Sequence, residues 1–150
     1  MAEYAGIERR LVFRLLDYWE QKKGERKMPS LNDIQASELI DDWDWCFLIS
    51  LGVEGESAVF THLGSLIWPA ERASLIGAQV SNCPDMTLIK QATSFMPRVL
   101  ELGVPVSIGG ECEDGGDALL YRSTLMPLSS DDVFVDALFG GANCRKVANG

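Results

Sequence analysis

Few side chains in this sequence could carry out acid–base or nucleophilic chemistry. His62 is the only histidine, and the four cysteines, Cys46, Cys83, Cys112 and Cys144, lie far apart along the chain. A structural zinc site normally has paired ligands at short spacing, and a nucleophilic cysteine needs a base beside it. We therefore predict no metal site and no catalytic residue. We expect the cysteines to be reduced thiols, packed as small apolar groups in a cytoplasmic protein.

Paired carboxylates are the other candidates for acid–base chemistry. They occur at Asp41-Asp42, at Glu111 and Glu113, and at Asp131-Asp132. Catalytic carboxylates need differing environments inside one cleft, whereas each of these pairs lies beside a predicted turn. We expect them to be solvated.

The charge is unevenly distributed over the 150 residues. Residues 1–27 hold seven Lys/Arg against five Asp/Glu, the rest hold six against seventeen, and the formal net charge is −9. An acidic body repels a phosphate backbone, so we predict no nucleic-acid partner. No run of about 18 apolar residues exists, so the sequence predicts no membrane span. The charged N-terminus is unlike a signal peptide.

Hydrophobic periodicity predicts helices at the N-terminus and in the middle of the chain. Apolar residues recur at spacings of three and four from Ile7 to Trp19, and Gly24 ends this pattern. We predict a short helix at 31–40 and another at 68–78 that begins near Pro69. A longer helix is predicted at 86–102, with a kink or a break at Pro97.

Strands are predicted on either side of the central helices. Apolar runs predict a hairpin of strands at 45–51 and 57–67, and three further strands at 105–113, 117–128 and 132–145. Because strands joined by short turns pair antiparallel, the expected fold class is α+β with one five-stranded antiparallel sheet. We expect helices on one face and an N-terminal amphipathic helix. Residues 1–27 would form that helix and its loop, and residues 28–147 a single domain.

A set of short motifs accompanies these elements. They are Tyr18-Trp19, the basic loop KKGERK, Met28-Pro29-Ser30, Asp33-Ile34, Gly64, Gly77 and Pro127-Leu128 followed by polar residues. In their order, and over about residues 10–140, they resemble the PAS domain family, in particular a subfamily of short stand-alone bacterial PAS proteins. The resemblance implies a PAS-like sheet and a sensor or regulatory role in bacterial signal transduction, with no catalytic output.

The resemblance implies no particular cofactor. Some PAS domains bind haem through a histidine, usually on the helix in the middle of the domain, whereas His62 lies on the predicted second strand. The subfamily often carries a Tyr-Arg pair in that strand, and here the sequence reads Phe60-Thr61-His62 without the arginine. We leave the cofactor unknown and do not expect haem.

Aromatic residues gather around the predicted hairpin. Such a group can line a pocket for a planar ligand, and ordinary core packing is the alternative. The predicted pocket residues are Trp45, Phe47, Phe60, His62 and Trp68.

The N-terminal helix has an apolar arc wider than one packing face needs. This predicts a second packing partner, and we expect a homodimer through that helix. The predicted contact residues are Ile7, Leu11, Leu15 and Trp19.

Three functions are compatible with the sequence. The leading hypothesis is a sensor or regulatory domain that binds a small-molecule ligand, a signalling protein partner, or both. The second is a protein-interaction adaptor with a filled core. The third is a small enzyme, which a reactive Cys83 or a perturbed titration of His62 would favour.

Overall fold

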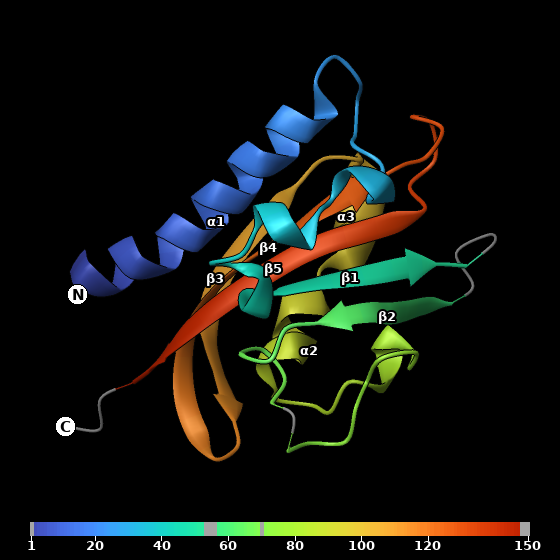
Figure 1. Cartoon of the computed structure of the whole chain (residues 1–150). Helices are drawn as coiled ribbons and strands as arrows, with labels where there is room; N and C mark the ends of the chain where they lie inside the picture. Colours follow the sequence, from blue (N-terminus) through green and yellow to red (C-terminus); the bar gives the residue numbers. More distant parts are fainter. Residues whose placement is uncertain (1, 53–56, 70, 148–150) are drawn as a thin grey trace.

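Five antiparallel strands form the centre of the fold, in the order β2-β1-β5-β4-β3 (Figure 1). They are β1 (Cys46–Leu51), β2 (Ala58–Leu63), β3 (Val106–Asp114), β4 (Asp117–Leu128) and β5 (Ala137–Lys146). The structure, a computed structural model, describes residues 2–52, 57–69 and 71–147, and their side chains from residue 10 onward. The hairpin β1–β2, the helical crossover and the meander β3–β4–β5 confirm the α+β fold class with one five-stranded antiparallel sheet that the sequence predicts.

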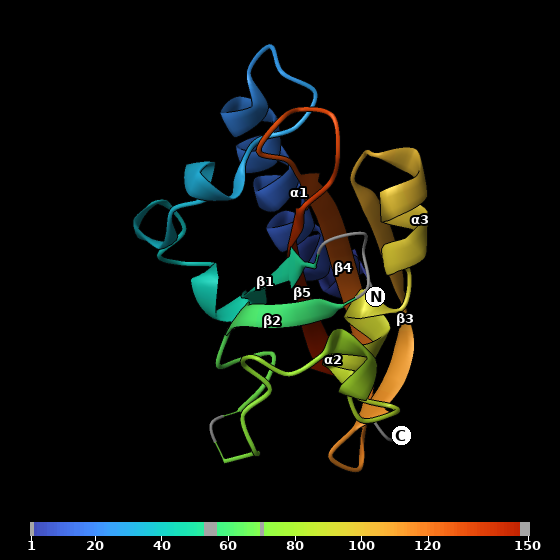
Figure 2. The same cartoon turned by 90° about the vertical axis from the view of Figure 1, so that its right-hand side faces the viewer.

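Helices cover both faces of this sheet (Figure 2). The short helices α2 (Leu88–Thr93) and α3 (Met96–Leu102) lie on the inner face, as expected for the crossover. The N-terminal helix α1 (Ala2–Lys23) lies on the outer face, against β4 and β5. Each face therefore has its own buried apolar cluster, one centred on Phe47 and the other on Leu15.

Two consecutive glycines in β5 let the two clusters approach the sheet closely. A Cβ atom at Gly140 would collide with the ring of Phe47 on the inner face, and one at Gly141 would collide with Cδ1 of Leu15 on the outer face. Successive residues of a strand point to opposite faces. The glycine pair thus makes room for one large side chain on each side of the same strand.

The central helices differ from the prediction. The expected helix at 86–102 is two helices that meet at Phe95, with Pro97 in the first turn of α3, so the predicted break is confirmed. Thr87 caps α2 by accepting a hydrogen bond from the N–H of Lys90, and Gly103 ends α3 at φ 68°. The expected helix at 31–40 is wrong, because two separate 3-10 turns, Leu31–Asp33 and Ala36–Glu38, occupy this segment.

The helix expected at 68–78 is also wrong. In its described residues this segment forms turns and isolated bridges, which pair Phe60 of β2 with Ile76 and Val59 with Gln79. The N–H of Phe60 donates to Ala78 O at 3.1 Å, and the N–H of Gly77 donates to Phe60 O at 2.8 Å. Backbone N–H and C=O groups that a helix would bond internally are therefore bonded to the edge of β2 instead.

None of the helices that the structure describes is long and apolar enough to cross a membrane.

Candidate functional site

The interior positions of the predicted pocket are filled by packed rings. Phe47 and Phe60 are both 0% exposed, and their rings contact each other edge to face at a centroid distance of 6.4 Å. Trp68 is also buried, and its Nε1–H donates to the carbonyl of Ala73 at 2.9 Å. Trp45 is half-buried where the two apolar clusters meet. Three of the five predicted residues, Phe47, Phe60 and Trp68, therefore belong to one inner cluster.

His62 does not join this interior group. The pairing of β1 with β2 shifts by one residue, because Leu48 pairs with His62 while Ile49 pairs with Phe60. Thr61 is the extra residue of this β-bulge, and a bulge changes the alternation of side chains. His62 consequently lies on the outer face, where its ring stacks on Trp43 at a centroid distance of 4.1 Å. The expectation that it would line one pocket with Phe60 is not met in this arrangement.

Burial disfavours the charged form of three groups that could act as nucleophiles or bases. Burial raises the pKa of the Cys46 and Cys83 thiols, and burial lowers the pKa of His62. The raised pKa disfavours the thiolate at both cysteines, and the thiolate is the reactive form of a cysteine. Within the described residues, no group of three or more His, Cys, Asp or Glu side chains is placed to hold a metal ion.

One carboxylate of the Asp41-Asp42 pair is not solvated, contrary to expectation, whereas Asp41 is exposed. Asp42 is 7% exposed, and its two carboxylate oxygens accept hydrogen bonds from Nε and Nη2 of Arg14 at 2.8 and 2.6 Å. This bidentate bond, followed by the charge of Asp42, raises the pKa of Arg14. This ion pair fixes α1 to the segment before β1, so Asp42 has a structural role.

The predicted dimer contacts of α1 lie against the chain's own sheet. Leu11, Leu15 and Trp19 are 1%, 0% and 2% exposed, and Nε1 of Trp19 donates to Pro127 O at 2.8 Å. The side chain of Ile7 lies outside the described part. While α1 holds this position, the three described residues cannot touch a second copy.

A surface groove at one end of the sheet is the candidate site. Its volume is about 680 Å³, and it is lined by residues 100–103 of α3 and the following turn, residues 133–136 before β5, residues 51–52 at the end of β1, and Met28. Four of its large apolar side chains are exposed: Leu100 by 37%, Leu102 by 51%, Val133 by 66% and Phe134 by 73%. We call this feature the apolar groove. Exposed apolar side chains gathered around one hollow are typical of binding sites.

Carboxylates hold the loop that displays Val133 and Phe134. Oδ1 of Asp131 accepts hydrogen bonds from the N–H groups of Val133 and Phe134, both at 2.9 Å. These bonds lower the pKa of Asp131, because they stabilise the ionised form. This local bonding replaces strand pairing. It explains why β5 begins at Ala137, so that the strand expected from residue 132 is wrong at its start.

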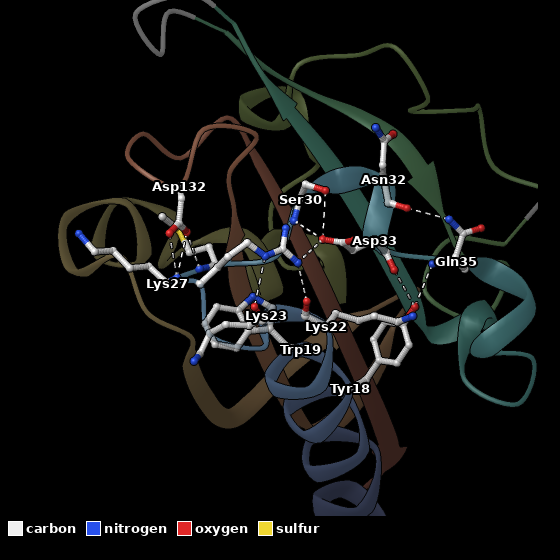
Figure 3. A network of polar contacts seen from close by, with 12 residues as sticks. Tyr18, Trp19, Lys22, Lys23, Lys27, Ser30, Asn32, Asp33, Gln35 and Asp132 are labelled. Atoms are coloured by element: carbon white, nitrogen blue, oxygen red, sulfur yellow. Dashed lines mark hydrogen bonds and ion pairs between the residues drawn. The ribbon is translucent and has the colours of Figure 1, made fainter.

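The same loop is tied to the segment that follows α1 (Figure 3). Oδ1 of Asp132 accepts from the N–H groups of Lys27 and Met28 at 2.9 and 3.1 Å. The Tyr18 hydroxyl of α1 joins this helix to residues 35–38. It donates a hydrogen bond to a carboxylate oxygen of Glu38 at 2.8 Å and accepts one from the N–H of Gln35. Burial is the main cause that raises the pKa of Tyr18 to about 12. One wall of the apolar groove is therefore anchored before any partner binds.

Sequence reasoning missed the apolar groove, although a signal was present. The pair Val133-Phe134 follows two aspartates that can bind the backbone locally, and such a turn displays whatever comes after it. Leu102 likewise comes just before Gly103, the residue that ends α3. Apolar residues directly beside a turn are candidates for exposure.

Comparison with known proteins adds structural neighbours only. No protein-family profile and no curated protein matches the chain. A light-oxygen-voltage domain studied with a flavin analogue is 12% identical over 69% of this chain and 76% of its own, with a TM-score of 0.46. A fungal light-oxygen-voltage photoreceptor is 13% identical over 76% of this chain and 94% of its own, with a TM-score of 0.46. An RNA-binding light-oxygen-voltage receptor is 18% identical over 70% of this chain and 31% of its own, with a TM-score of 0.42.

Proposed function

We propose that this chain is a PAS-type regulatory domain that acts by binding a protein partner at the apolar groove, and that it has no catalytic output. The observation that carries the proposal is the exposure of Leu100, Leu102, Val133 and Phe134 around one hollow. A role in bacterial signal transduction is the setting that the PAS resemblance implies.

A protein segment suits the apolar groove better than a small metabolite does. A metabolite site buries most of its ligand among a few convergent polar groups. Here the walls are apolar and open to solvent, and the charged residues among those that line the groove are Glu101 and Asp136. The body of the chain is also strongly acidic. The partner we propose therefore presents apolar side chains flanked by Lys or Arg, since charge complementarity favours that pairing.

The state of the reactive groups supports binding over catalysis. Burial raises the pKa of Cys83, and His62 lies on the opposite face of the sheet from the inner cluster that holds Cys83. A general base must be able to reach the proton it removes. The packing of Phe47 against Phe60 thus favours an adaptor with a filled core as the form of this proposal.

A small ligand among Trp45, Phe47, Phe60, His62 and Trp68 stays a prediction. Because Phe47 and Phe60 fill the inner cluster, such a ligand would have to displace at least one of these rings. Native mass spectrometry of the freshly purified protein tests this, because a bound molecule adds its own mass to that of the chain.

Site-specific photocrosslinking tests the proposed docking. Benzoylphenylalanine is placed at Phe134 in the full chain, expressed in the organism that encodes it. The matched control carries the same group at Ile40, which is 77% exposed but does not line the apolar groove. We expect one discrete protein adduct from position 134, lost when Leu102→Asp is added, and none from position 40. No adduct at 134, or the same adducts from both positions, would refute the proposal.

A further inference from the structure

The two edges of the sheet are treated differently by the rest of the chain. The β2 edge is covered, because residues 76–79 bond to it at Val59 and Phe60. Among the described residues, β3 is hydrogen-bonded along its length to β4, and no backbone hydrogen bond joins it to a further element. An uncovered edge strand offers a row of N–H and C=O groups to another strand.

The first half of β3 also lacks the features that usually block such pairing. Its nine residues pair with β4 without a register shift, so no bulge turns the edge away. Residues 106–110 read VSIGG and carry no charge and no proline, and Gly109 and Gly110 are exposed. The second half, residues 111–114, is acidic, with Glu111, Glu113 and Asp114. Lysine, proline, bulges or a covering segment are the usual protections of an edge.

We propose that the β3 edge is a homodimer interface, at which a second copy of this chain adds its own β3 antiparallel around a two-fold axis at Gly110. In this register Gly109 of one copy faces Glu111 of the other, and Ser107 faces Glu113. Each acidic half then lies against an uncharged half. A parallel alignment would place like charges side by side, which destabilises cross-strand pairs. The sequence of β3 is thus complementary to itself only when the two copies run in opposite directions.

Arg122 supplies a counter-charge for this register. It is the β4 residue opposite Gly109, and its Cδ and Nε lie 3.0 and 3.2 Å from the place where a Cβ of Gly109 would be. Its side chain therefore crosses the glycine toward the β3 edge. With strands about 4.8 Å apart, the Cα of Glu111 of the second copy would lie about 10 Å from that of Arg122, within the combined reach of the two side chains. The two-fold axis makes this ion pair twice.

Exposed apolar surface lies at the same edge. Phe13 of α1 is 58% exposed, and a hollow of about 280 Å³ separates α1 from β3, lined by Val12, Phe13, Leu16, Ser107, Ile108 and Arg122. A strand added to β3 would cover part of this hollow and bury Phe13, which adds an apolar contribution to the backbone hydrogen bonds. The interface goes beyond the proposed function, and it replaces the predicted dimer contact through the inward side of α1.

Oligomeric state measured by analytical ultracentrifugation of the full chain over a concentration series tests the interface. We expect the wild type to dimerise and Glu111→Lys to shift the chain to a monomer, because the introduced positive charge would face Arg122 of the second copy. Adding Arg122→Glu to Glu111→Lys reverses both charges and should restore the dimer. Glu25→Lys is the matched control, since Glu25 is exposed in the polar loop after α1, and it should leave the dimer unchanged.

The register is tested by cross-linking in a Cys112→Ser background. Gly110→Cys lies on the proposed axis and should form a disulfide-linked dimer on mild oxidation, whereas Glu113→Cys faces Ser107 and should not. A wild type that is monomeric at every concentration would overturn the proposal. A Glu111→Lys variant that dimerises as strongly as the wild type would overturn it too. Photocrosslinking at Phe134 reports on the other site, so the two proposals can fail separately.

Discussion

Removing the Leu15 side chain distinguishes a core role for α1 from a dimer role. Leu15 is 0% exposed, and its Cδ1 lies against Gly141, which has no side chain to fill the space left behind. A Leu→Ala change costs the lost burial plus the unfilled cavity, so Leu15→Ala should cost about 3 to 5 kcal/mol of unfolding free energy. For a domain of this size that loss corresponds to roughly 10 °C in the melting temperature.

Thermal and urea unfolding at several protein concentrations provide the assay. If Leu15 belongs to the monomer core, the loss for Leu15→Ala relative to the wild type is the same at every concentration. If Leu15 contacts a second copy, the loss depends on concentration and the variant sediments as a folded monomer. Leu102→Ala is the matched control, because the same change at a side chain 51% exposed should cost less than about 0.5 kcal/mol. A loss below about 1 kcal/mol for Leu15→Ala would refute the reasoning.

Three further predictions follow from individual contacts. Burial lowers the pKa of His62 below its ordinary 6.5. As the pH drops below about 6.5, the unfolded chain therefore takes up the proton more readily than the folded chain, and the free energy of unfolding falls. In urea titrations, the difference in this free energy between pH 7.5 and pH 5.5 should be smaller for His62→Gln than for the wild type. Asp131→Ala at neutral pH should speed hydrogen exchange of the Phe134 amide, and in the wild type the same protection should be lost as the pH falls below 3.8 through the lowered pKa of Asp131. Arg72→Gln leaves Asp114, whose side chain is 9% exposed, with fewer hydrogen-bond partners, and should lower the free energy of unfolding by about 1–3 kcal/mol. A double-mutant cycle with Asp114→Asn, measured by urea unfolding, should show coupling between the two residues.

The strand pattern was predictable because alternation and turns are local signals. The bounds of β1, β3 and β4 lie within a residue or two of those predicted from apolar runs. The hairpin of β1 and β2 and the antiparallel meander of β3, β4 and β5 are confirmed by the pairing. Local patterns are sufficient here, since a half-buried strand must alternate wherever it lies in the sheet.

The position of His62 was not predictable from the same rule. Counting by two along β2 places Phe60 and His62 on one face, and this would be correct for a regular strand. The register shift between Leu48 and Ile49 inserts Thr61, so the two rings lie on opposite faces. A bulge depends on how two strands pair, and one strand's sequence does not contain that information.

The non-helical structure of residues 68–78 was not predictable for a related reason. Their composition suits a helix that starts at Pro69, yet the β2 edge needs hydrogen-bond partners and residues 76–79 supply them. Propensity is a weak preference that a tertiary demand of this kind overrides. The apolar arc of α1 was likewise visible, but periodicity cannot say whether Leu11 and Leu15 are buried by the same chain or by a second copy.

The glycine pair of β5 is packed tightly from both faces of the sheet. Phe47 presses on Gly140 from the inner face and Leu15 presses on Gly141 from the outer face, with no side chain between ring and backbone on either side. Interiors packed at this density transmit displacements, because neighbouring atoms have no free volume to absorb them. The inner cluster and α1 therefore contact the same strand, β5, at two adjacent residues and from opposite faces.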